Sequence, residues 1–411
     1  MQKGARFFLS SLFLFFAGCA TVPPKPPTPP LAAPPITRYT ALTRLDPQDI
    51  PNFEDDLDSG TLRAAALQSL AYYQSLPAEQ HFVLGKDTYT VGDLAASMAS
   101  LVMLLETHPQ PQEWLPALRE TFAVYQSAGV DPEKTVVFSS YYEPSLSARL
   151  TPDARYKFPL YGRPPDLLDV DLSLFDPAYV GARIAGRRVG RAVVPYSTRA
   201  DIDSRKSLQG QGLEIAWAKD PMEVLDLQIE GSGWLDLGEG EMRRIRYDGD
   251  NGRRYKSVGQ YLIATGRIPG KKFSRQAFLR YMAKHPKERQ DLINVNERYI
   301  FFRIDTSSAG ANAYGNINVP LTPGRSIATD PKLFPKGALA WIDTTRSVVT
   351  RKDRVKGSTP LKRFMVNQDE GGAIQGPGRV DIFAGEGHDA KLFATHLWNK
   401  GKLYFLVKKK S

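Results

Sequence analysis

The sequence has 411 residues, 42% of them hydrophobic and 10% aromatic, which is ordinary for a globular protein with a proper core. The length predicts two or three domains. The formal net charge is +10, but no block of lysine and arginine is interleaved with aromatic residues, so we expect no nucleic-acid partner. A mildly basic surface also suits an anionic polymer such as a cell wall that carries carboxylates.

The N-terminus has the pattern of a bacterial export signal. Lys3 and Arg6 precede an apolar run that is too short to span a bilayer as a helix. The run closes with Phe16-Ala17-Gly18-Cys19, which follows the pattern of a lipobox. We therefore expect a lipoprotein signal peptide over residues 1–18 and a lipid on Cys19. The alternative is an ordinary signal peptide followed by an incidental cysteine or a buried thiol.

Cys19 is the only cysteine, which excludes a disulfide scaffold and a cysteine-based metal site. Ala20 follows it, where an aspartate would favour retention in the inner membrane, so we expect the outer membrane of a Gram-negative bacterium and a protein that faces the periplasm. Residues 19–50 form a tether rich in proline. Its densest part, residues 21–35, spans roughly 45 Å at about 3.1 Å per residue.

Residues 58–128 are predicted to be helical, with apolar stripes typical of a core rather than of cofactor contacts. Thr61 is expected to cap the first helix. Thr90-Val91-Gly92-Asp93 resembles a capping box at the start of the second, and Pro111 opens the third.

From Thr135 onward, short apolar runs alternate with turn residues, a pattern typical of strands in a sandwich or a barrel. The predicted strands are 136–138, 193–194, 215–217, 225–229, 300–304, 339–342, 364–366, 380–383 and 403–407. Helices are expected at 257–265 and 274–285. The chain is therefore predicted to be mainly β with N-terminal helices.

Two aspartates near the C-terminus, Asp369 and Asp381, are separated by a loop that contains five glycine or proline residues. Asp381 lies in a β-like run, so its side chain should face away from Val380 and Ile382. A second carboxylate nearby, or burial, would raise the pKa of Asp381 and leave a proton for general acid catalysis. The alternative is that each aspartate only binds backbone amides in a glycine-rich turn.

Residues 369–383 resemble the C-terminal three-aspartate domain of the membrane-bound lytic transglycosylase A family, whose pattern is close to D-x-G-G-A-I-x-G-x-x-x-D-I-[FY]. The third family aspartate falls on Asp330. Further resembling blocks are Ser140–Pro144 (G-Y-Y-x-P), Pro195–Ile202 (P-[YS]-x-x-R-A-x-I), Gln228–Gly233 (Q-x-Q-G-S-G), Asn251–Gly259 (N-G-x-x-Y-x-S-[IV]-G), Phe301–Arg303 and Val319–Leu321. Ser140 departs from the pattern by replacing a glycine, and Glu230 by replacing a glutamine.

The resemblance implies a double-psi β-barrel domain assembled, with the helical region, from residues 51–147 and 311–411. A smaller β-barrel of residues 148–310 would be inserted into it, and the groove between the two would bind glycan strands. The implied activity is lytic transglycosylation, which cleaves the β-1,4 bond between N-acetylmuramic acid and N-acetylglucosamine and leaves 1,6-anhydromuramic acid ends.

By the same resemblance, Asp381 would act first as the acid and then as the base, supported by Asp369 and Asp330. The candidates for substrate binding are Tyr141, Tyr142, Glu143, Gln228, Gly231, Ser232 and Gly233, and Trp234 offers a further stacking face. The expected partners are peptidoglycan glycan strands, the membrane through the lipid anchor, and proteins of cell-wall synthesis.

No cofactor or metal is expected, because the five histidines lack the spacing of metal ligands. Two other functions stay open. One is an inverting glycan hydrolase with two working carboxylates, because double-psi barrels also occur in cellulases. The other is a wall-binding lipoprotein without catalytic activity.

Overall fold

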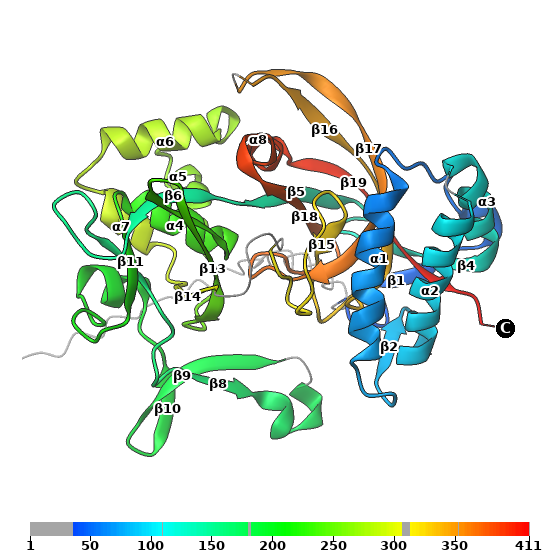
Figure 1. Cartoon of the computed structure of the whole chain (residues 1–411), viewed down its shortest axis with the longest axis horizontal. Coiled ribbons are helices and arrows are strands. Elements are labelled where there is room, and N and C mark those ends of the chain that lie inside the picture. The colour runs from blue at the N-terminus through cyan, green and yellow to red at the C-terminus, as the bar shows by residue number, and fades with distance from the viewer. Residues whose placement is uncertain (1–35, 109, 180–181, 306–312, 352, 411) are drawn as a thin grey trace, which may run out of the picture. The chain divides into compact units, whose positions relative to one another are not determined.

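The structure, a computed structural model, describes residues 36–411 except for 109, 180–181, 306–312, 352 and 411 (Figure 1). The predicted signal peptide, Cys19 and the proline-rich part of the tether lie outside the described residues. Within the described ranges, no helix combines the length and the apolar character needed to cross a bilayer.

The largest sheet has eight strands and is built from two separate parts of the chain. Its strands are β1 (Leu42–Arg44), β4 (Phe122–Ser127), β5 (Val136–Glu143), β15 (Ser326–Ala328), β16 (Leu339–Val349), β17 (Val355–Asp369), β18 (Arg379–Glu386) and β19 (Asn399–Lys408). The order is β1-β4-β19-β16-β17-β15-β18-β5, and β19 also pairs with β5. The strands from β19 to β5 therefore form a closed, six-stranded ring of pairings.

The register of the short strand β15 determines where the two C-terminal aspartates lie. β15 pairs in parallel with β17 and antiparallel with β18. In both ladders the partner of Ala328 is an aspartate, Asp369 on one side and Asp381 on the other. Because neighbouring strands are about 4.8 Å apart, the Cα atoms of the two aspartates are separated by roughly 10 Å.

Helices cover part of this sheet: α1 (Ser59–Gln74), α2 (Val91–Thr107), α3 (Pro111–Thr121) and α8 (Gly387–His396). The predicted capping box of Thr90 and Asp93 is confirmed, as is Pro111 in the first turn of α3. The prediction for Thr61 was wrong. The cap of α1 is Asp58, whose carboxylate accepts a hydrogen bond from the Thr61 amide at 2.9 Å.

Residues 58–128 are also not helical throughout, because the region contains β4 and the hairpin of β2 (His81–Leu84) and β3 (Asp87–Thr90). Five single helical turns complete the described helices, at Pro47–Asp49, Leu172–Leu174, Pro177–Tyr179, Ala200–Ser204 and Gly270–Lys272.

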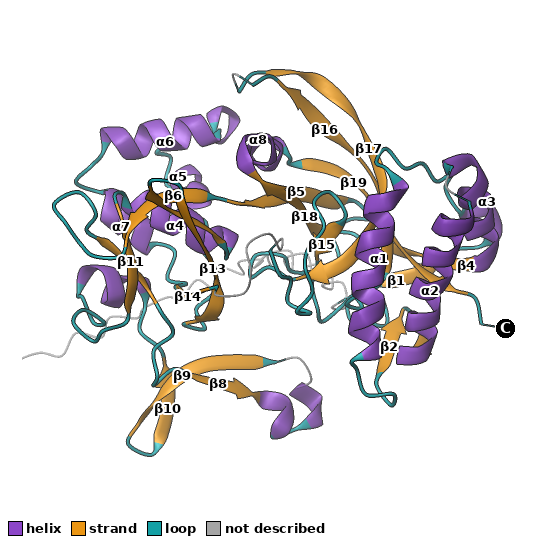
Figure 2. Ribbon diagram, in the orientation of Figure 1, coloured by secondary structure: helices purple, strands orange, loops and turns teal. Residues whose placement is uncertain are grey.

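A second sheet, with its own hydrophobic core, comes from the middle of the chain (Figure 2). Its six strands are β6 (Ser145–Arg149), β7 (Phe158–Tyr161), β11 (Glu214–Ala218), β12 (Gly233–Gly238), β13 (Glu241–Asp250) and β14 (Ile300–Ile304). The order is β14-β13-β12-β6-β11-β7, and the outer strands β14 and β7 contact each other. Helices α4 (Pro221–Glu230), α5 (Val258–Ala264), α6 (Arg275–Lys284) and α7 (Arg289–Asn294) belong to the same part of the chain.

The predicted strand 225–229 was wrong, because these residues lie in α4. Asp220 caps this helix, Pro221 occupies its first turn, and Gly231 ends it with φ +86°. A run of five apolar residues is too short for its period to separate a helix from a strand. The flanking cap residues carried the better signal.

A third, smaller sheet consists of β8 (Leu168–Asp171), β9 (Arg183–Val189) and β10 (Ala192–Pro195), in the order β10-β9-β8.

The guanidinium of Arg325, which immediately precedes β15, is fully buried and makes six hydrogen bonds. It binds both carboxylate oxygens of Asp55 at 2.8 and 2.9 Å and the Thr61 hydroxyl at 3.0 Å. It also donates to the carbonyl oxygens of Leu57, Asp58 and Phe364, each at 2.8 Å. One side chain therefore joins the segment before α1 to the strands that carry the aspartates.

We predict that Arg325→Met lowers the free energy of unfolding by about 3–5 kcal/mol, because the buried Asp55 carboxylate loses its partner. Urea denaturation measures this loss. Arg63→Met is the matched control, since Arg63 pairs with Glu106 at an exposed position and should cost no more than about 1 kcal/mol. Equal losses in the two variants would contradict the proposed importance of Arg325.

Candidate active site

Asp381 lies in the middle of β18 and is half-buried. The hydroxyl of Ser139, its partner across the β5–β18 ladder, donates a hydrogen bond of 2.7 Å to Oδ1. Arg379 in turn donates to the Ser139 hydroxyl at 2.9 Å. Among the described residues no other hydrogen bond to this carboxyl is recorded, so Oδ2 stays open to an incoming group.

Burial raises the pKa of Asp381 to about 6. The hydrogen bond from Ser139 and the positive charge of Arg379 lower this pKa, and the charge of Asp369 raises it, but burial is the largest effect. A carboxyl with a pKa near 6 is still partly protonated close to neutral pH. It can therefore donate a proton in one step and accept one in the next.

Asp369, at the end of β17, differs from Asp381 because both of its oxygens are occupied. The Tyr141 hydroxyl donates to Oδ2 at 2.6 Å, and the Asn316 amide donates to Oδ1 at 3.0 Å. Burial raises the pKa of Asp369 and also that of Tyr141. In this arrangement Asp369 fixes the surrounding backbone and acts on Asp381 through its charge.

Asp330 is buried, and within the described part of the chain its carboxylate accepts hydrogen bonds from two backbone amides. Oδ1 accepts from Lys332 at 3.0 Å and Oδ2 accepts from Gly376 at 2.8 Å. The second bond fastens the glycine-rich loop between Asp369 and Asp381. This placement gives Asp330 a backbone-binding role.

Three residues near the aspartates were missed by the sequence analysis: Ser139, Arg379 and Lys336. Lys336 is buried and donates from Nζ to the backbone carbonyls of Thr329, at 3.3 Å, and Asp369. Burial lowers the pKa of Lys336 to about 8. The apolar residues around Lys336 could have indicated its burial, whereas Ser139 is found only once the β5–β18 register is known.

A fourth carboxyl reaches this region from the six-stranded part of the chain. Glu230 is the last residue of α4, and its Oε2 accepts a hydrogen bond from the Tyr142 amide at 3.2 Å. Burial raises the pKa of Glu230 to about 8, and the nearby charge of Asp381 adds to the increase. At neutral pH Glu230 is therefore mostly uncharged, like the glutamine that it replaces in the family pattern.

Several predicted substrate-binding residues lie at the junction between the two larger sheets and contact other parts of the protein. The buried Glu143 carboxylate forms an ion pair with Arg244 and accepts a hydrogen bond from the Ser232 hydroxyl at 2.9 Å. Gly233 lies so close to the chain that a Cβ atom there would be 2.5 Å from the Pro144 carbonyl oxygen. Gly231 provides the left-handed turn that ends α4.

The structure does not bring Gln228 to the aspartates. Its side chain is 5% exposed and donates to the Ile300 carbonyl oxygen at 3.3 Å, inside the six-stranded part. Tyr142 and Trp234 are half-buried and keep accessible surface.

Two further contacts join the two parts of the chain. The Trp234 indole donates to the Glu386 carboxylate at 2.7 Å. A Cβ atom on Gly372 would lie 3.3 Å from the guanidinium of Arg298. The open oxygen of Asp381 therefore lies on the large sheet close to its contacts with the six-stranded part. Among the described residues, no group of three or more histidine, aspartate or glutamate side chains is arranged to hold a metal ion.

The chain is similar to several known proteins. Residues 137–303 match the family model described as the MltA specific insert domain, and residues 325–407 match the one described as the 3D domain. The chain is 26% identical over 321 residues to the membrane-bound lytic murein transglycosylase A of Vibrio cholerae, covering 76% of this chain and 77% of that protein. It is 28% identical over 304 residues to the Escherichia coli K12 protein of the same name, covering 72% and 74%.

A solved structure, that of a membrane-bound lytic murein transglycosylase from Agrobacterium tumefaciens, is also similar. It aligns with a TM-score of 0.72 at 27% identity and covers 90% of this chain and 98% of its own.

We predict that Glu230→Gln stabilises the protein increasingly as the pH rises. The pKa of Glu230 is about 8 in the folded state, against an ordinary value of 4.5. Between these pH values the unfolded state loses the proton while the folded state keeps it, so the wild type becomes less stable as the pH rises. Thermal melts at pH 4, 6 and about 8.5 should show a growing gap between the variant and the wild type. Glu79→Gln, at an exposed position, should show no such trend, and a gap independent of pH for Glu230→Gln would contradict the prediction.

Proposed function

Because the chain belongs to the membrane-bound lytic murein transglycosylase A family, we propose that Asp381 alone carries its proton transfers. The protein is a peptidoglycan lytic transglycosylase, an enzyme that acts on the glycan strands of murein. The bond cleaved is the β-1,4 linkage between N-acetylmuramic acid and N-acetylglucosamine.

One observation carries the assignment of roles: of the three aspartates, Asp381 alone keeps an oxygen without a recorded hydrogen bond within the described chain. Asp369 and Asp330 each use both oxygens to hold Tyr141 and backbone amides. They are positioning residues. Asp381, whose pKa is raised, supplies the proton.

The reaction then proceeds in two proton transfers. Asp381 donates its proton to the glycosidic oxygen as the bond from C1 of the muramic acid breaks, and N-acetylglucosamine leaves with a new hydroxyl. The resulting carboxylate accepts the proton of the C6 hydroxyl of the same muramic acid as that oxygen bonds to C1. The product is a 1,6-anhydro ring, and Asp381 has its proton again.

An inverting hydrolase would need a second carboxylate that activates water. Asp369 and Asp330 are occupied, and Glu230 keeps its proton up to a pH of about 8, so these three carboxyls are poor bases near neutral pH. The C6 hydroxyl belongs to the reacting sugar itself, which gives it a high effective concentration at C1. This geometry favours the intramolecular attack.

We place the substrate where the eight-stranded sheet and the six-stranded sheet contact each other. We assign the helical region and a double-psi barrel to residues 51–147 and 311–411, and the inserted barrel to residues 148–310. Tyr142 and Trp234, both half-buried at this junction, offer faces for sugar rings. Protonated Glu230 can donate a hydrogen bond to the glycan as a glutamine amide would.

The protein associates with a membrane of a Gram-negative bacterium, as the names of its relatives indicate. The finer location is part of our proposal: a lipid on Cys19 and the outer membrane, with the folded part in the periplasm. The lipobox pattern and the proline-rich tether support it.

We predict that Asp381→Asn folds normally and lowers the release of muropeptides at least about a hundredfold, because an amide cannot donate the required proton. Digestion of purified sacculi, analysed by mass spectrometry, measures the release. In oxygen-18 water the wild type should give anhydro ends without label, each lighter than a hydrolytic product by one water.

Two variants serve as controls for this experiment. Asp389→Asn, at an exposed position on α8, should retain full activity. Ser139→Ala should stay active and shift the loss of activity with rising pH to higher pH, because the Ser139 hydrogen bond lowers the pKa of Asp381. Activity above roughly a tenth of wild type in Asp381→Asn, or label at C1 in most products, would reject the mechanism.

We further predict that Cys19→Ala, expressed with a cleavable signal peptide, gives a periplasmic protein that separates from membranes in high salt and still digests isolated sacculi. The lone cysteine of the lipobox is the expected attachment point of the lipid. If the variant remained firmly in the membrane fraction, even at high salt, the anchor would lie elsewhere.

A further inference from the structure

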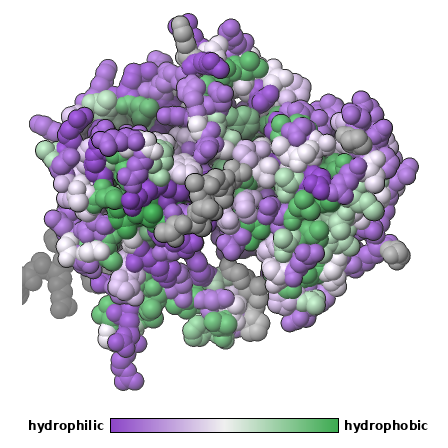
Figure 3. All heavy atoms as spheres, in the orientation of Figure 1, coloured by the Kyte–Doolittle hydropathy of each residue, from purple (hydrophilic) through white to green (hydrophobic). Residues whose placement is uncertain are grey.

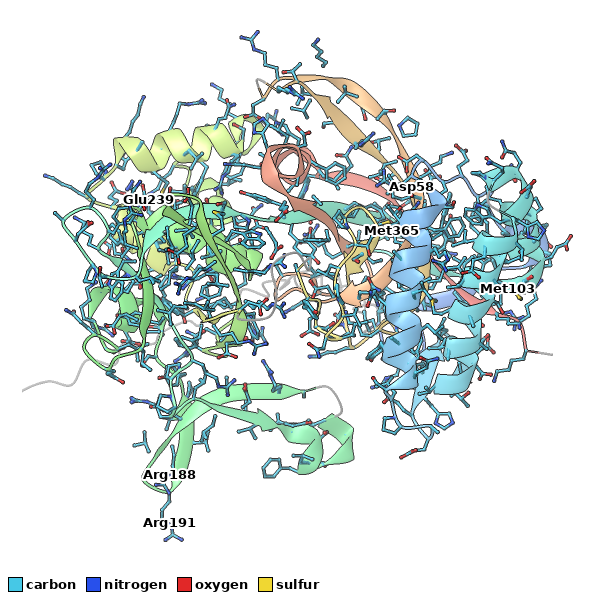
Figure 4. The ribbon with its side chains drawn as sticks, in the orientation of Figure 1. Asp58, Met103, Arg188, Arg191, Glu239 and Met365 are labelled. Atoms are coloured by element: carbon cyan, nitrogen blue, oxygen red, sulfur yellow. The ribbon has the colours of Figure 1, made fainter. Side chains whose placement is uncertain are left out.

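The three-stranded sheet of β8, β9 and β10 forms an arm whose exposed surface plays no part in the reaction described above (Figure 4). Residues 168–195, which contain this arm and two single helical turns, hold seven of the 22 exposed large hydrophobic side chains of the described chain. Leu174 and Phe175 are the most exposed of these, at 83% and 76%. Such a concentration of apolar surface marks an interaction site.

One face of the arm is covered by the rest of the protein. Ala185 of β9 packs against the hydrophobic cluster that contains Tyr196, and a Cβ atom on Gly252 would come within 3.0 Å of Ala185. Asp169, on the same face, is held by Arg163 at 2.7 Å. These contacts fix which face of the arm points outward.

The outward face combines aliphatic side chains along its length with an arginine near the tip. The register places Ile184 opposite Val170, and Val193 opposite Arg188, so all four side chains share the face. Ile184 and Val193 are about half exposed, at 47% and 50%. Figure 3 shows hydrophobic surface next to a hydrophilic tip at the lower left of the view.

The hairpin of residues 183–195 has four arginines and no acidic residue. Two of them, Arg188 and Arg191, lie at its tip (Figure 4), are exposed, and have no recorded ion pair among the described residues. Its charge is therefore complementary to an anionic surface. Aliphatic side chains favour the boundary of a lipid layer over a sugar, which is bound mainly by aromatic faces and polar groups.

We propose that this arm docks on an anionic phospholipid surface, with the arginines of the tip at the headgroups and the apolar face against the acyl boundary. The proposal rests on the membrane association assigned above, which keeps a lipid surface within reach of a tethered body. The lipid expected on Cys19 would keep the folded part near the membrane, and a basic apolar patch would add a second contact with its surface. The arm would also orient the enzyme on the membrane.

The test uses the full mature chain with Cys19→Ala, so that no lipid contributes, and vesicles of phosphatidylethanolamine with or without phosphatidylglycerol. We expect sedimentation with the phosphatidylglycerol vesicles, weakened by salt. Arg188→Glu with Arg191→Glu should weaken it at least about thirtyfold, since each basic residue near an anionic surface contributes roughly a fivefold factor. Ile184→Ser with Val193→Ser should weaken binding to these vesicles at both low and high salt, because this pair contributes apolar contact rather than charge.

The matched control is Arg280→Glu with Lys284→Glu, which makes the same change in net charge on exposed positions of α6. It should bind vesicles within about threefold of the parent protein. Equal loss in both charge variants, or equal binding to vesicles without phosphatidylglycerol, would overturn the proposal. So would an arm variant that loses binding to sacculi but not to vesicles, which would make the wall the partner.

Digestion of soluble murein separates this proposal from the mechanism. All arm variants should digest it at the parent rate, which also shows that they fold. If the parent protein has no lytic activity but Arg188→Glu with Arg191→Glu still weakens vesicle binding, the proposed function is wrong. The proposed docking surface is then still supported.

Discussion

The buried guanidinium of Arg325 is the constraint on which the geometry of the active site depends. A charge without contact to water must find partners for its hydrogen-bond donors, and this arginine finds all of them in the segment before α1, in α1 itself and in β17. β15 begins at the next residue, and its Ala328 then has an aspartate on either side. A side chain remote from the chemistry thereby determines the spacing of two carboxyls.

Three aspartates in one small region obtain different roles from their hydrogen bonds rather than from their chemical type. Two are saturated by donors, and the third has one donor on one oxygen. Burial raises the pKa of Asp381, while Ser139 and Arg379 limit the rise so that the group can still ionise. An acid that must also act as a base needs a pKa between these extremes.

How much the sequence could predict depends on whether the signal was local. The capping box of α2, the proline that opens α3, and the strand that contains Asp381 follow from neighbouring residues, and they were predicted correctly. Ser139 could not be assigned to Asp381, because 242 residues separate them and only the parallel register brings them together. α4 was predicted as a strand because a short apolar run carries no reliable period. Gln228 was expected in the groove, but its place on the inner side of α4 turns it towards Ile300.

Glu230 illustrates how a charge-changing substitution can leave the chemistry intact. Asp381 has the lower pKa and ionises first, and its negative charge then opposes the ionisation of Glu230. In the proposed reaction Asp381 becomes a carboxylate after it has protonated the leaving oxygen, at the moment when a competing base would direct water to C1. That new charge holds the proton on Glu230 more firmly. Glu230 therefore stays protonated in the step in which it could otherwise activate water as a base. Water activated by Glu230 then does not compete with the C6 hydroxyl for C1.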